Sequence, residues 1–297
     1  MSRRAAVLGH PISHSKSPLL HAAAYRALGF DAEYTAIDVD EPELASFMRR
    51  VRQDPSWCGL SVTMPLKKAM MGLVDEHTVA ATDLGVLNTV TFTPGADGPH
   101  LRGHNTDVMG IVNALRHASG MSSLHGADVS DLKVGTRPAI LGGGGTSTAA
   151  IAALARLGHD AVTLFVRDPA RIAEARKAAG ASGVNLDVRA YDGAAEQLPG
   201  FDVVISTLPP RAADPLAAGL APGAETGERV LLDVAYDPWP SALASAWSAR
   251  GGVVVPGLEM LLYQAVEQVL LFTGTGPEAA GRVIDAMCDA VNAPRRG

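Results

Sequence analysis

The chain has 297 residues, of which 47% are hydrophobic and 19% charged, and its formal net charge at pH 7 is −6. This balance is typical of a globular protein long enough for two domains, and it excludes a disordered or fibrous chain. The acidic charge offers no basic footprint for nucleic acid or for an anionic membrane surface. We therefore expect neither nucleic acid nor a membrane among the partners.

The two cysteines, Cys58 and Cys288, lie far apart, and neither has histidine or cysteine neighbours at metal-ligand spacing. We interpret both as small hydrophobic residues. The N-terminal residues do not form a secretory signal, because the polar residues 10–16 interrupt the short apolar run. Charged residues also break the longest alanine-rich stretch, residues 148–166, so no membrane span is predicted. We expect a cytoplasmic protein.

In the first third of the chain, short β-type runs alternate with helical patterns, as in βαβ units with largely parallel sheets. The predicted strands are 4–9, 32–39, 58–63 and 86–93, and the predicted helices are 18–28, 42–52, 66–76 and 107–118. The polar, glycine-containing residues 119–136 are interpreted as a connection or surface loop.

From residue 138 the alternation restarts with greater regularity. Strands are predicted at 138–142, 161–166, 185–191, 201–207, 229–236 and 252–257, with helices at 146–157, 169–179 and 241–250. Six strands with crossover helices match a full dinucleotide-binding sheet. Two later helices, 258–274 and 277–291, have no strand left to cover there, so we expect them to pack on the first domain.

The stretch HSKSP, residues 14–18, follows the first predicted strand. Ser17 before Pro18 is typical of a helix N-cap and first helical position, because a serine oxygen accepts a backbone N–H and proline has none to satisfy. With the hydroxyls of Ser15 and Ser17, the positive end of this helix could hold a small anion. From these residues alone, an ordinary strand-to-helix turn is the more frequent alternative.

The glycine run from Gly142 to Gly145 stands between a predicted strand and a predicted helix. Glycines there permit a tight turn and let a pyrophosphate approach the backbone N–H groups of the helix N-terminus. The spacing of Gly142, Gly144 and Ser147 departs from the strict fingerprint in its last residue, although serine is also small. The strand–turn–helix context favours dinucleotide binding over a flexible turn.

At the end of the next predicted strand stands Arg167, where NADP sites offer arginine to the 2′-phosphate and NAD sites usually offer an acid to the ribose. Arg171 lies one helical turn later, and two guanidinium groups can clamp a phosphate. In the alternative interpretation Arg171 pairs with Asp168, which would also repel the phosphate. We predict NADP as the cofactor and leave NAD use open.

Three polar clusters, residues 61–68, 86–90 and 104–107, interrupt apolar strand ends in the first domain. Ligands of open α/β sheets bind at the carboxyl ends of strands, so these clusters indicate a site. Lys67 and Asp107 form the plausible ammonium–carboxylate pair. Hydride delivery to a ketone requires a proton for the alkoxide, which a lysine held by a carboxylate can supply. Taken singly, such residues are more often solvated, capping or turn residues.

Taken in order, these motifs resemble the shikimate dehydrogenase family, and the resemblance covers essentially the whole chain. The family's SxS motif is similar to residues 15–17, its VTxPxK motif to 62–67, its NT motif to 88–89 and its NTD motif to 105–107. The glycine run, the arginine pair and a late GLxML…Q segment at 257–264 follow in the expected places.

The resemblance implies reversible reduction of 3-dehydroshikimate to shikimate with NADPH, in the pathway to aromatic amino acids. It makes Lys67 and Asp107 the catalytic pair. The implied substrate residues are Ser15 and Ser17 for the carboxylate, Thr63, Asn88, Asp107 and Gln264 for the ring hydroxyls, and Tyr236 closing over the carboxylate. The implied cofactor residues are Gly142, Gly143, Gly144, Gly145, Thr146, Arg167, Arg171 and Gly257. Packing of Tyr236 beside Trp239 is an equally frequent alternative for that tyrosine.

Four features depart from the family pattern. His104 stands where many relatives carry aspartate, Val108 and Glu259 replace common glycines, and residues 166–168 read Val-Arg-Asp instead of Asn-Arg-Thr. None removes a proposed catalytic group, but the last bears on the choice of cofactor. We predict no metal, because the N-terminal histidines lack acidic or thiolate company and the chemistry needs no Lewis acid.

We therefore predict an α/β enzyme of two domains with a cleft between them. Residues 1–107, completed by the C-terminal helices 257–297, would form the substrate-binding domain, and residues 108–256 a doubly wound, Rossmann-type dinucleotide-binding domain, in a monomer or homodimer. Rivals are a quinate/shikimate dehydrogenase that prefers NAD, a paralogue acting on another small hydroxy acid, and a catalytically silent sensor of nucleotides or metabolites. Lys67 with Asp107 argues against the sensor.

Overall fold

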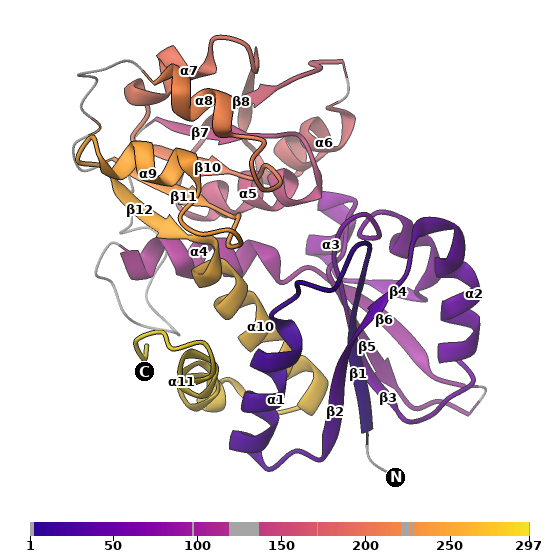
Figure 1. Ribbon diagram of the computed structural model, residues 1–297. Coiled ribbons are helices and arrows are strands. Elements are labelled where there is room, and N and C mark those ends of the chain that lie inside the picture. The colour runs from indigo at the N-terminus through magenta and orange to yellow at the C-terminus, as the bar shows by residue number, and fades with distance from the viewer. Residues whose placement is uncertain are drawn as a thin grey trace. The chain divides into compact units, whose positions relative to one another are not determined.

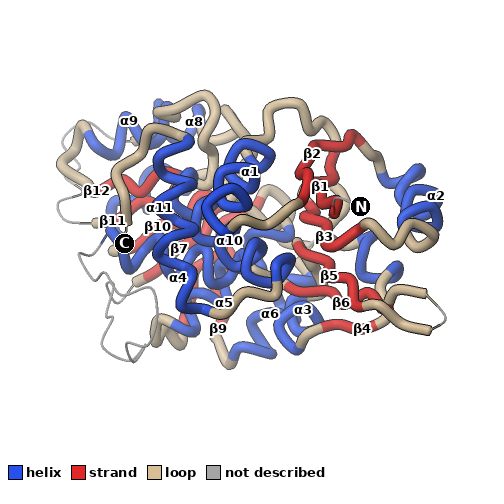
Figure 2. The backbone as a smooth tube through the Cα atoms, turned by 90° about the horizontal axis from the view of Figure 1, so that it is seen from below, coloured by secondary structure: helices blue, strands red, loops and turns tan. Residues whose placement is uncertain are grey.

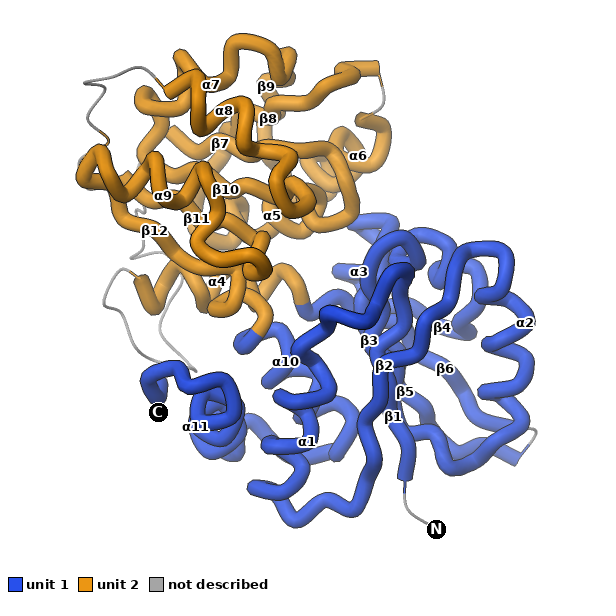
Figure 3. The backbone as a smooth tube through the Cα atoms, viewed as in Figure 1, with its two compact units in different colours: residues 1–106, 262–297 blue, residues 107–261 orange. Residues whose placement is uncertain are grey.

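The fold is described from a computed structural model, for residues 3–96, 98–118, 137–170, 172–220, 226 and 229–296. The chain divides into two compact units (Figure 3), unit 1 with residues 1–106 and 262–297 and unit 2 with residues 107–261. The second boundary falls inside helix α10 (Gly257–Thr273). The predicted α/β class with a Rossmann-type sheet is confirmed.

In the described residues, unit 1 holds one six-stranded sheet in the order β2-β1-β3-β5-β6-β4. Its strands are β1 (Arg3–Gly9), β2 (Ala32–Asp38), β3 (Trp57–Val62), β4 (Glu76–His77), β5 (Thr89–Thr93) and β6 (His100–His104). The strands β1, β2 and β3 run parallel, whereas β5 is antiparallel to both β3 and β6. β4 is parallel to β6, so five of the six described strands run in one direction and β5 alone opposes them. The expectation of a largely parallel sheet is therefore confirmed in this half, with β5 as the exception, because a short connection joins it to an antiparallel neighbour, β6.

Helices cover both faces of this sheet. They are α1 (Ser17–Leu28), α2 (Glu41–Val51), α3 (Val79–Leu84), α10 from Leu262 onward and α11 (Ala280–Ala290), with 3-10 turns η1 (Ala69–Leu73) and η4 (Pro277–Ala279). Figure 2 shows α1 and α10 on one side of the strands and α2 on the other. The apolar face of α2, with Leu44, Phe47 and Met48, packs into a core that includes Leu60 and Val90.

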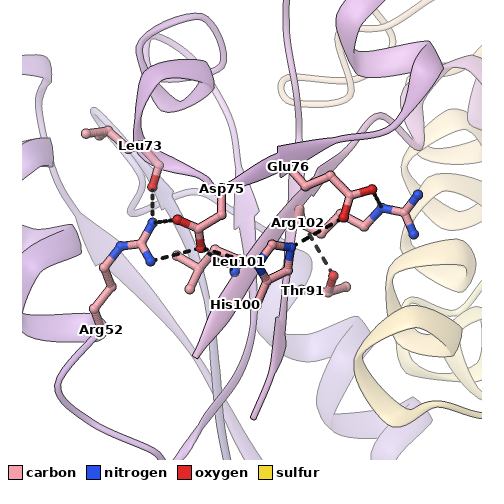
Figure 4. A network of polar contacts seen from close by, with 8 residues as sticks. All are labelled: Arg52, Leu73, Asp75, Glu76, Thr91, His100, Leu101 and Arg102. Atoms are coloured by element: carbon pink, nitrogen blue, oxygen red, sulfur yellow. Dashed lines mark hydrogen bonds and ion pairs between the residues drawn. The ribbon is translucent and has the colours of Figure 1, made fainter. Parts of the chain in front are cut away.

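The predicted helix 66–76 is wrong. Residues 69–73 form the 3-10 turn η1, and residues 76–77 form the edge strand β4. Between them, the Asp75 carboxylate accepts two hydrogen bonds from the Arg52 guanidinium, at 2.8 and 3.0 Å, and one from the backbone N–H of Leu101 at 2.8 Å (Figure 4). These tertiary contacts hold the chain against β6 and override the helical pattern. The elements α3 and β6 were not predicted.

Unit 2 contains, within its described ranges, a fully parallel six-stranded sheet in the order β12-β11-β10-β7-β8-β9 (Figure 1). The strands are β7 (Pro138–Leu141), β8 (Ala161–Val166), β9 (Asn185–Ala190), β10 (Val203–Ser206), β11 (Val230–Asp233) and β12 (Val253–Pro256). Counted along the chain this order is 3-2-1-4-5-6, that of a dinucleotide-binding sheet. All six strands predicted here are confirmed.

In its described residues, unit 2 has the helices α4 (Asp107–Ala118), α5 (Gly145–Arg156), α6 (Ala173–Ser182), α7 (Ala194–Gln197), α8 (Asp214–Gly219) and α9 (Ala242–Ser248), the 3-10 turn η3 (Leu198–Gly200) and the start of α10. The helix predicted from residue 169 begins only at Ala173. The Asp168 carboxylate accepts the backbone N–H of Ala170 at 3.0 Å, and this local turn delays the helix. The predicted loop 119–136 lies outside the described residues.

Candidate active site

Unit 1 brings together two residues that the sequence assigned to the substrate, Asn88 and Gln264. The Asn88 side-chain nitrogen Nδ2 donates to Thr106 Oγ1 at 2.9 Å and to Gln264 Oε1 at 3.3 Å. The backbone N–H of Thr106 donates to Asn88 Oδ1 at 2.8 Å. All three side chains are buried. Buried amides that bond one another hold a fixed orientation, as a binding site requires.

The backbone of the proposed lysine is attached to the same segment. Leu87, which precedes Asn88, donates its N–H to the carbonyl oxygen of Lys67 at 3.1 Å, and the Lys67 side chain is half-buried. Asp107 directly follows Thr106, is buried, and is the first residue of α4, where the helix dipole favours a negative charge. Hydrogen bonds therefore anchor the chain next to both proposed catalytic residues.

The segment after β3 passes close to the first strand. Thr63 donates its N–H to the carbonyl of Leu8 at 2.8 Å. A Cβ added to Gly9 would lie 2.5 Å from Thr63 Cγ2 and 2.9 Å from the carbonyl oxygen of Met64. Glycine at position 9 is therefore required for Thr63 to lie over the end of β1.

The prediction that Ser17 caps α1 is wrong. The N-cap position is Lys16, and Ser17 is the first helical residue. Ser15 supplies the side-chain oxygen instead, because its Oγ accepts the backbone N–H of Ser17 at 3.3 Å, as in a serine turn. Ser17 is buried and Ser15 half-buried. Both hydroxyls stay at the N-terminus of a twelve-residue helix, where an anion is stabilised.

The glycine run of unit 2 forms a cradle between β7 and α5. Gly142 has φ +105°, and a Cβ there would lie 2.7 Å from Thr207 Oγ1. A Cβ at Gly143 would lie 3.1 Å from Val166 Cγ1, whereas Gly144, the N-cap of α5, has open space around it. Gly145 and the half-buried Thr146 begin the helix, and Ser147 in its first turn is fully buried. This geometry fits a dinucleotide pyrophosphate.

The residues that bear on NADP lie after β8. Arg167 is exposed. Burial raises the pKa of the Tyr191 phenol, and the positive charge of Arg167 acts in the opposite direction. Arg171 lies outside the described residues, so its pairing with Asp168 stays a prediction. Asp168 has another role in the structure, because its carboxylate holds the turn at Ala170.

Two further predicted residues flank the start of α10. Tyr236 is half-buried, and burial followed by the charge of Asp237 raises its pKa. A Cβ at Gly257 would lie 2.3 Å from the carbonyl oxygen of Val234, so packing alone requires glycine there. Nearby, Asp233 accepts the Ser241 hydroxyl at 2.6 Å and the N–H of Ala235 at 3.3 Å, and burial raises its pKa.

The described part of the chain contains no group of three or more His, Cys, Asp and Glu side chains able to hold a metal ion. Burial lowers the pKa of His21 to about 3, so its imidazole is neutral at physiological pH. His104 Nε2 lies 2.9 Å from Thr91 Oγ1. Burial lowers the pKa of His104. Among the helices described, none has the length and apolar character to cross a membrane.

Comparison with known proteins decides the family. Residues 7–90 match the model described as the shikimate dehydrogenase substrate binding domain, and residues 142–235 match an NAD(P)H-binding model. The chain is 36% identical over 278 residues to the shikimate dehydrogenase (NADP(+)) of Rubrobacter xylanophilus, covering 92% of this chain and 91% of that protein. The chain belongs to the shikimate dehydrogenase family.

Solved structures of shikimate dehydrogenases have the same fold as this chain. The shikimate dehydrogenase of Mycobacterium tuberculosis matches with a TM-score of 0.78 at 37% identity, covering 98% of this chain and 99% of that one. The shikimate 5-dehydrogenase of Thermus thermophilus, solved in complex with NADP(H) and shikimate, matches with a TM-score of 0.73 at 29% identity, covering 97% and 99%.

Within this family fold, the sequence-based interpretation did not single out four residues that support the site: Ser61, Thr89, Thr106 and Gln268. Thr106 and Thr89 lie inside recognised motifs. The hydrogen bond between Asn88 and Thr106 depends on how β5 pairs with β6, whereas Thr89 bonds to its chain neighbour Asn88. Gln268 carries one available signal. It is a polar residue four positions after Gln264 on a predicted apolar helix, and so lies on the same face.

Proposed function

We propose that this protein catalyses the reversible, NADP-dependent reduction of 3-dehydroshikimate to shikimate. Membership of the shikimate dehydrogenase family supports the reaction. The observation in the structure that supports it best is the buried hydrogen-bonded set of Asn88, Thr106 and Gln264, which brings together residues of three separate family motifs. A sensor would have no need of Lys67 and Asp107 beside such a set.

Each substrate residue has a role that follows from its chemistry. Ser15 and Ser17 would bind the carboxylate with their hydroxyls at the positive end of α1. Thr63, Asn88 and Gln264 would bind the ring hydroxyls, because hydroxyl and amide groups can both donate and accept hydrogen bonds. Tyr236 would donate its phenol to the carboxylate, and the raised pKa keeps that phenol protonated at neutral pH.

Lys67 would act on the carbonyl oxygen of the substrate. Its ammonium stabilises the negative charge that develops there and supplies the proton that converts the alkoxide to a hydroxyl. Asp107 would hold the ammonium in place. In the direction of oxidation the step runs in reverse: the neutral amine of Lys67 accepts the hydroxyl proton and becomes the ammonium.

Unit 2 would hold NADP with Gly142, Gly143, Gly144, Gly145 and Thr146 around the pyrophosphate. A bound nicotinamide supplies or accepts the hydride equivalent. Arg167 would bind the 2′-phosphate, with Arg171 as the predicted second guanidinium, and Gly257 is a further proposed cofactor-binding residue. A cytoplasmic location and a monomeric or homodimeric state remain predictions from the sequence.

The test is the rate of reduced cofactor formation by the purified protein with shikimate or quinate, each supplied with NADP+ or NAD+. We expect turnover with shikimate and NADP+ to exceed that of the other three combinations. Preference for NAD+ or quinate would support the quinate/shikimate dehydrogenase instead. Absence of turnover in all four, by a folded protein, would favour the sensor.

A further inference from the structure

A continuous string of side-chain hydrogen bonds runs through unit 1 to the proposed substrate amides. Tyr34 Oη donates to Ser61 Oγ at 2.7 Å, and Ser61 Oγ donates to Gln268 Oε1 at 2.7 Å. Gln268 Nε2 donates to Thr89 Oγ1 at 2.9 Å and to the backbone carbonyl of Asn88 at 3.2 Å. Thr89 Oγ1 donates to Asn88 Oδ1 at 2.8 Å.

Two backbone groups determine the direction of every bond in this string. The carbonyl of Asn88 can only accept, so the amide nitrogen of Gln268 must face it and the amide oxygen must face Ser61. The N–H of Thr106 can only donate, so Asn88 Oδ1 must face it. The nitrogen Nδ2 of Asn88 is thereby directed at Gln264 Oε1.

Burial makes these orientations strict. Ser61, Asn88, Thr89 and Gln268 are each at most 4% exposed. Without water to replace a lost partner, a rotated amide of Gln268 would set its oxygen against the Asn88 carbonyl and leave Thr89 without its donor. The string therefore has one satisfied arrangement.

Close packing between α10 and β3 brings Gln268 within reach. A Cβ at Gly59 would lie 2.1 Å from the ring of Phe272, so glycine lets the helix approach the strand. Gly59 and Ser61 share one face of β3, and Gln264, Gln268 and Phe272 share one face of α10. Gln268, which contacts Ser61, thus lies one helical turn from Gln264, the proposed substrate residue.

The far end of the string leads to the other proposed anchor. Burial raises the pKa of Tyr34, whereas hydrogen bonds with Ser61 and Ser17 oppose that rise. Ser17 is a proposed ligand of the substrate carboxylate. The ring of His21, a residue of α1, stacks on the ring of Tyr34 at the end of the string, with ring centroids 3.8 Å apart.

We propose that Gln268 is a positioning residue for the substrate, one that fixes the side-chain amides of Asn88 and Gln264 in the orientation that binds the ring hydroxyls. The inference rests on the proposed function, because it names what those amides bind. Gln268 itself acts through Asn88 and Thr89.

The experiment compares Gln268→Met, which keeps the length of the side chain and removes both hydrogen-bonding groups, with wild type. We expect the KM for shikimate to rise about three- to tenfold, the range for loss of one or two neutral hydrogen bonds. The kcat and the KM for NADP+ should change less than twofold. Gln268→Glu, which keeps the acceptor for Ser61 but loses the donor for Asn88, should raise the same KM at least as much.

The control is Thr273→Val, a matched loss of a hydroxyl on the same helix, where Thr273 Oγ1 donates to the carbonyl of Val269 at 2.8 Å. It should leave the KM for shikimate unchanged. An effect that followed the melting temperature instead of the position in the string would overturn the positioning role.

Three further outcomes are decisive. A folded Gln268→Met variant with wild-type KM for shikimate overturns the inference while the proposed function stands. If that variant does not fold, Ser61→Ala decides in the same way, because it leaves the Gln268 oxygen without its donor. A wild-type protein that neither binds shikimate in calorimetry nor oxidises it overturns the proposed function, and this inference with it.

Discussion

Asn88 and Gln264, which lie 176 positions apart in the sequence, are joined by a hydrogen bond of 3.3 Å from Nδ2 to Oε1. The bond links a residue next to β5 with a helix from the C-terminal part of the chain, both in unit 1. Leu87 donates its N–H to the carbonyl of Lys67, and Thr106, which precedes Asp107, donates its N–H to Asn88. The pair of Asn88 and Gln264 is therefore the centre of the proposed site.

Gly257 should not tolerate a side chain. Its added Cβ would lie 2.3 Å from the backbone oxygen of Val234, which cannot move as a flexible side chain does. We expect Gly257→Ala to lower the free energy of unfolding by roughly 1 to 3 kcal/mol, the range for overpacking. Urea denaturation measures it.

Gly281→Ala is the matched control, because nothing lies within 4 Å of a Cβ at this position in α11. Alanine there should raise the unfolding free energy by roughly 0.5 to 1 kcal/mol through better helix propensity. Equal destabilisation by the two substitutions would contradict the packing argument for Gly257.

His21 should make the protein sensitive to acid. Its pKa falls from 6.5 to about 3 on burial, so between these values the unfolded chain binds the proton and the folded chain does not. The free energy of unfolding should therefore decrease as the pH falls below 6.5, by up to about 1.4 kcal/mol per pH unit. Above pH 7 this effect vanishes.

In His21→Phe, which keeps an aromatic ring beside Tyr34, that contribution should disappear. Urea denaturation of both proteins between pH 7 and pH 5 gives the comparison. If the free energy of unfolding fell equally with pH in the wild type and the variant, His21 would not be the group that causes the acid sensitivity.

Arg167 should discriminate between the two cofactors. Loss of a charge-assisted bond to the 2′-phosphate predicts that Arg167→Ala raises the KM for NADP+ roughly tenfold or more, with little change for NAD+. Arg176→Ala removes the same charge from an exposed position on α6 and serves as the control. Equal loss with both cofactors would remove Arg167 from 2′-phosphate recognition.

The parts of the fold that the sequence could predict are those governed by local pattern. The central strands of unit 2, β7, β8, β10 and β11, are largely buried and parallel, so they appear as apolar runs separated by helical segments. The helix predicted at 66–76 failed because Arg52 and Leu101 hold Asp75 at a sheet edge, a contact between distant residues. The Ser17 cap failed because Ser15 was the better placed hydroxyl.

The site divides in the same way. Asn88 and Gln264 were singled out because recognisable motifs carry them, and the structure joins their side chains by a hydrogen bond; their binding of substrate stays a prediction. The role of Gln268 could not, because it depends on how closely α10 packs against Gly59 of β3 and on which residues of that strand then face the helix. Spacing within one segment does not contain that information.

The most direct test of the proposed site is the kinetics of Lys67→Ala, measured together with shikimate binding by calorimetry. In the proposed mechanism Lys67 acts most strongly on the charge that develops in the transition state. We therefore expect kcat to fall by at least about a hundredfold, whereas the Kd for shikimate should change only a few-fold. A turnover number equal to that of the wild type would remove Lys67 from the mechanism.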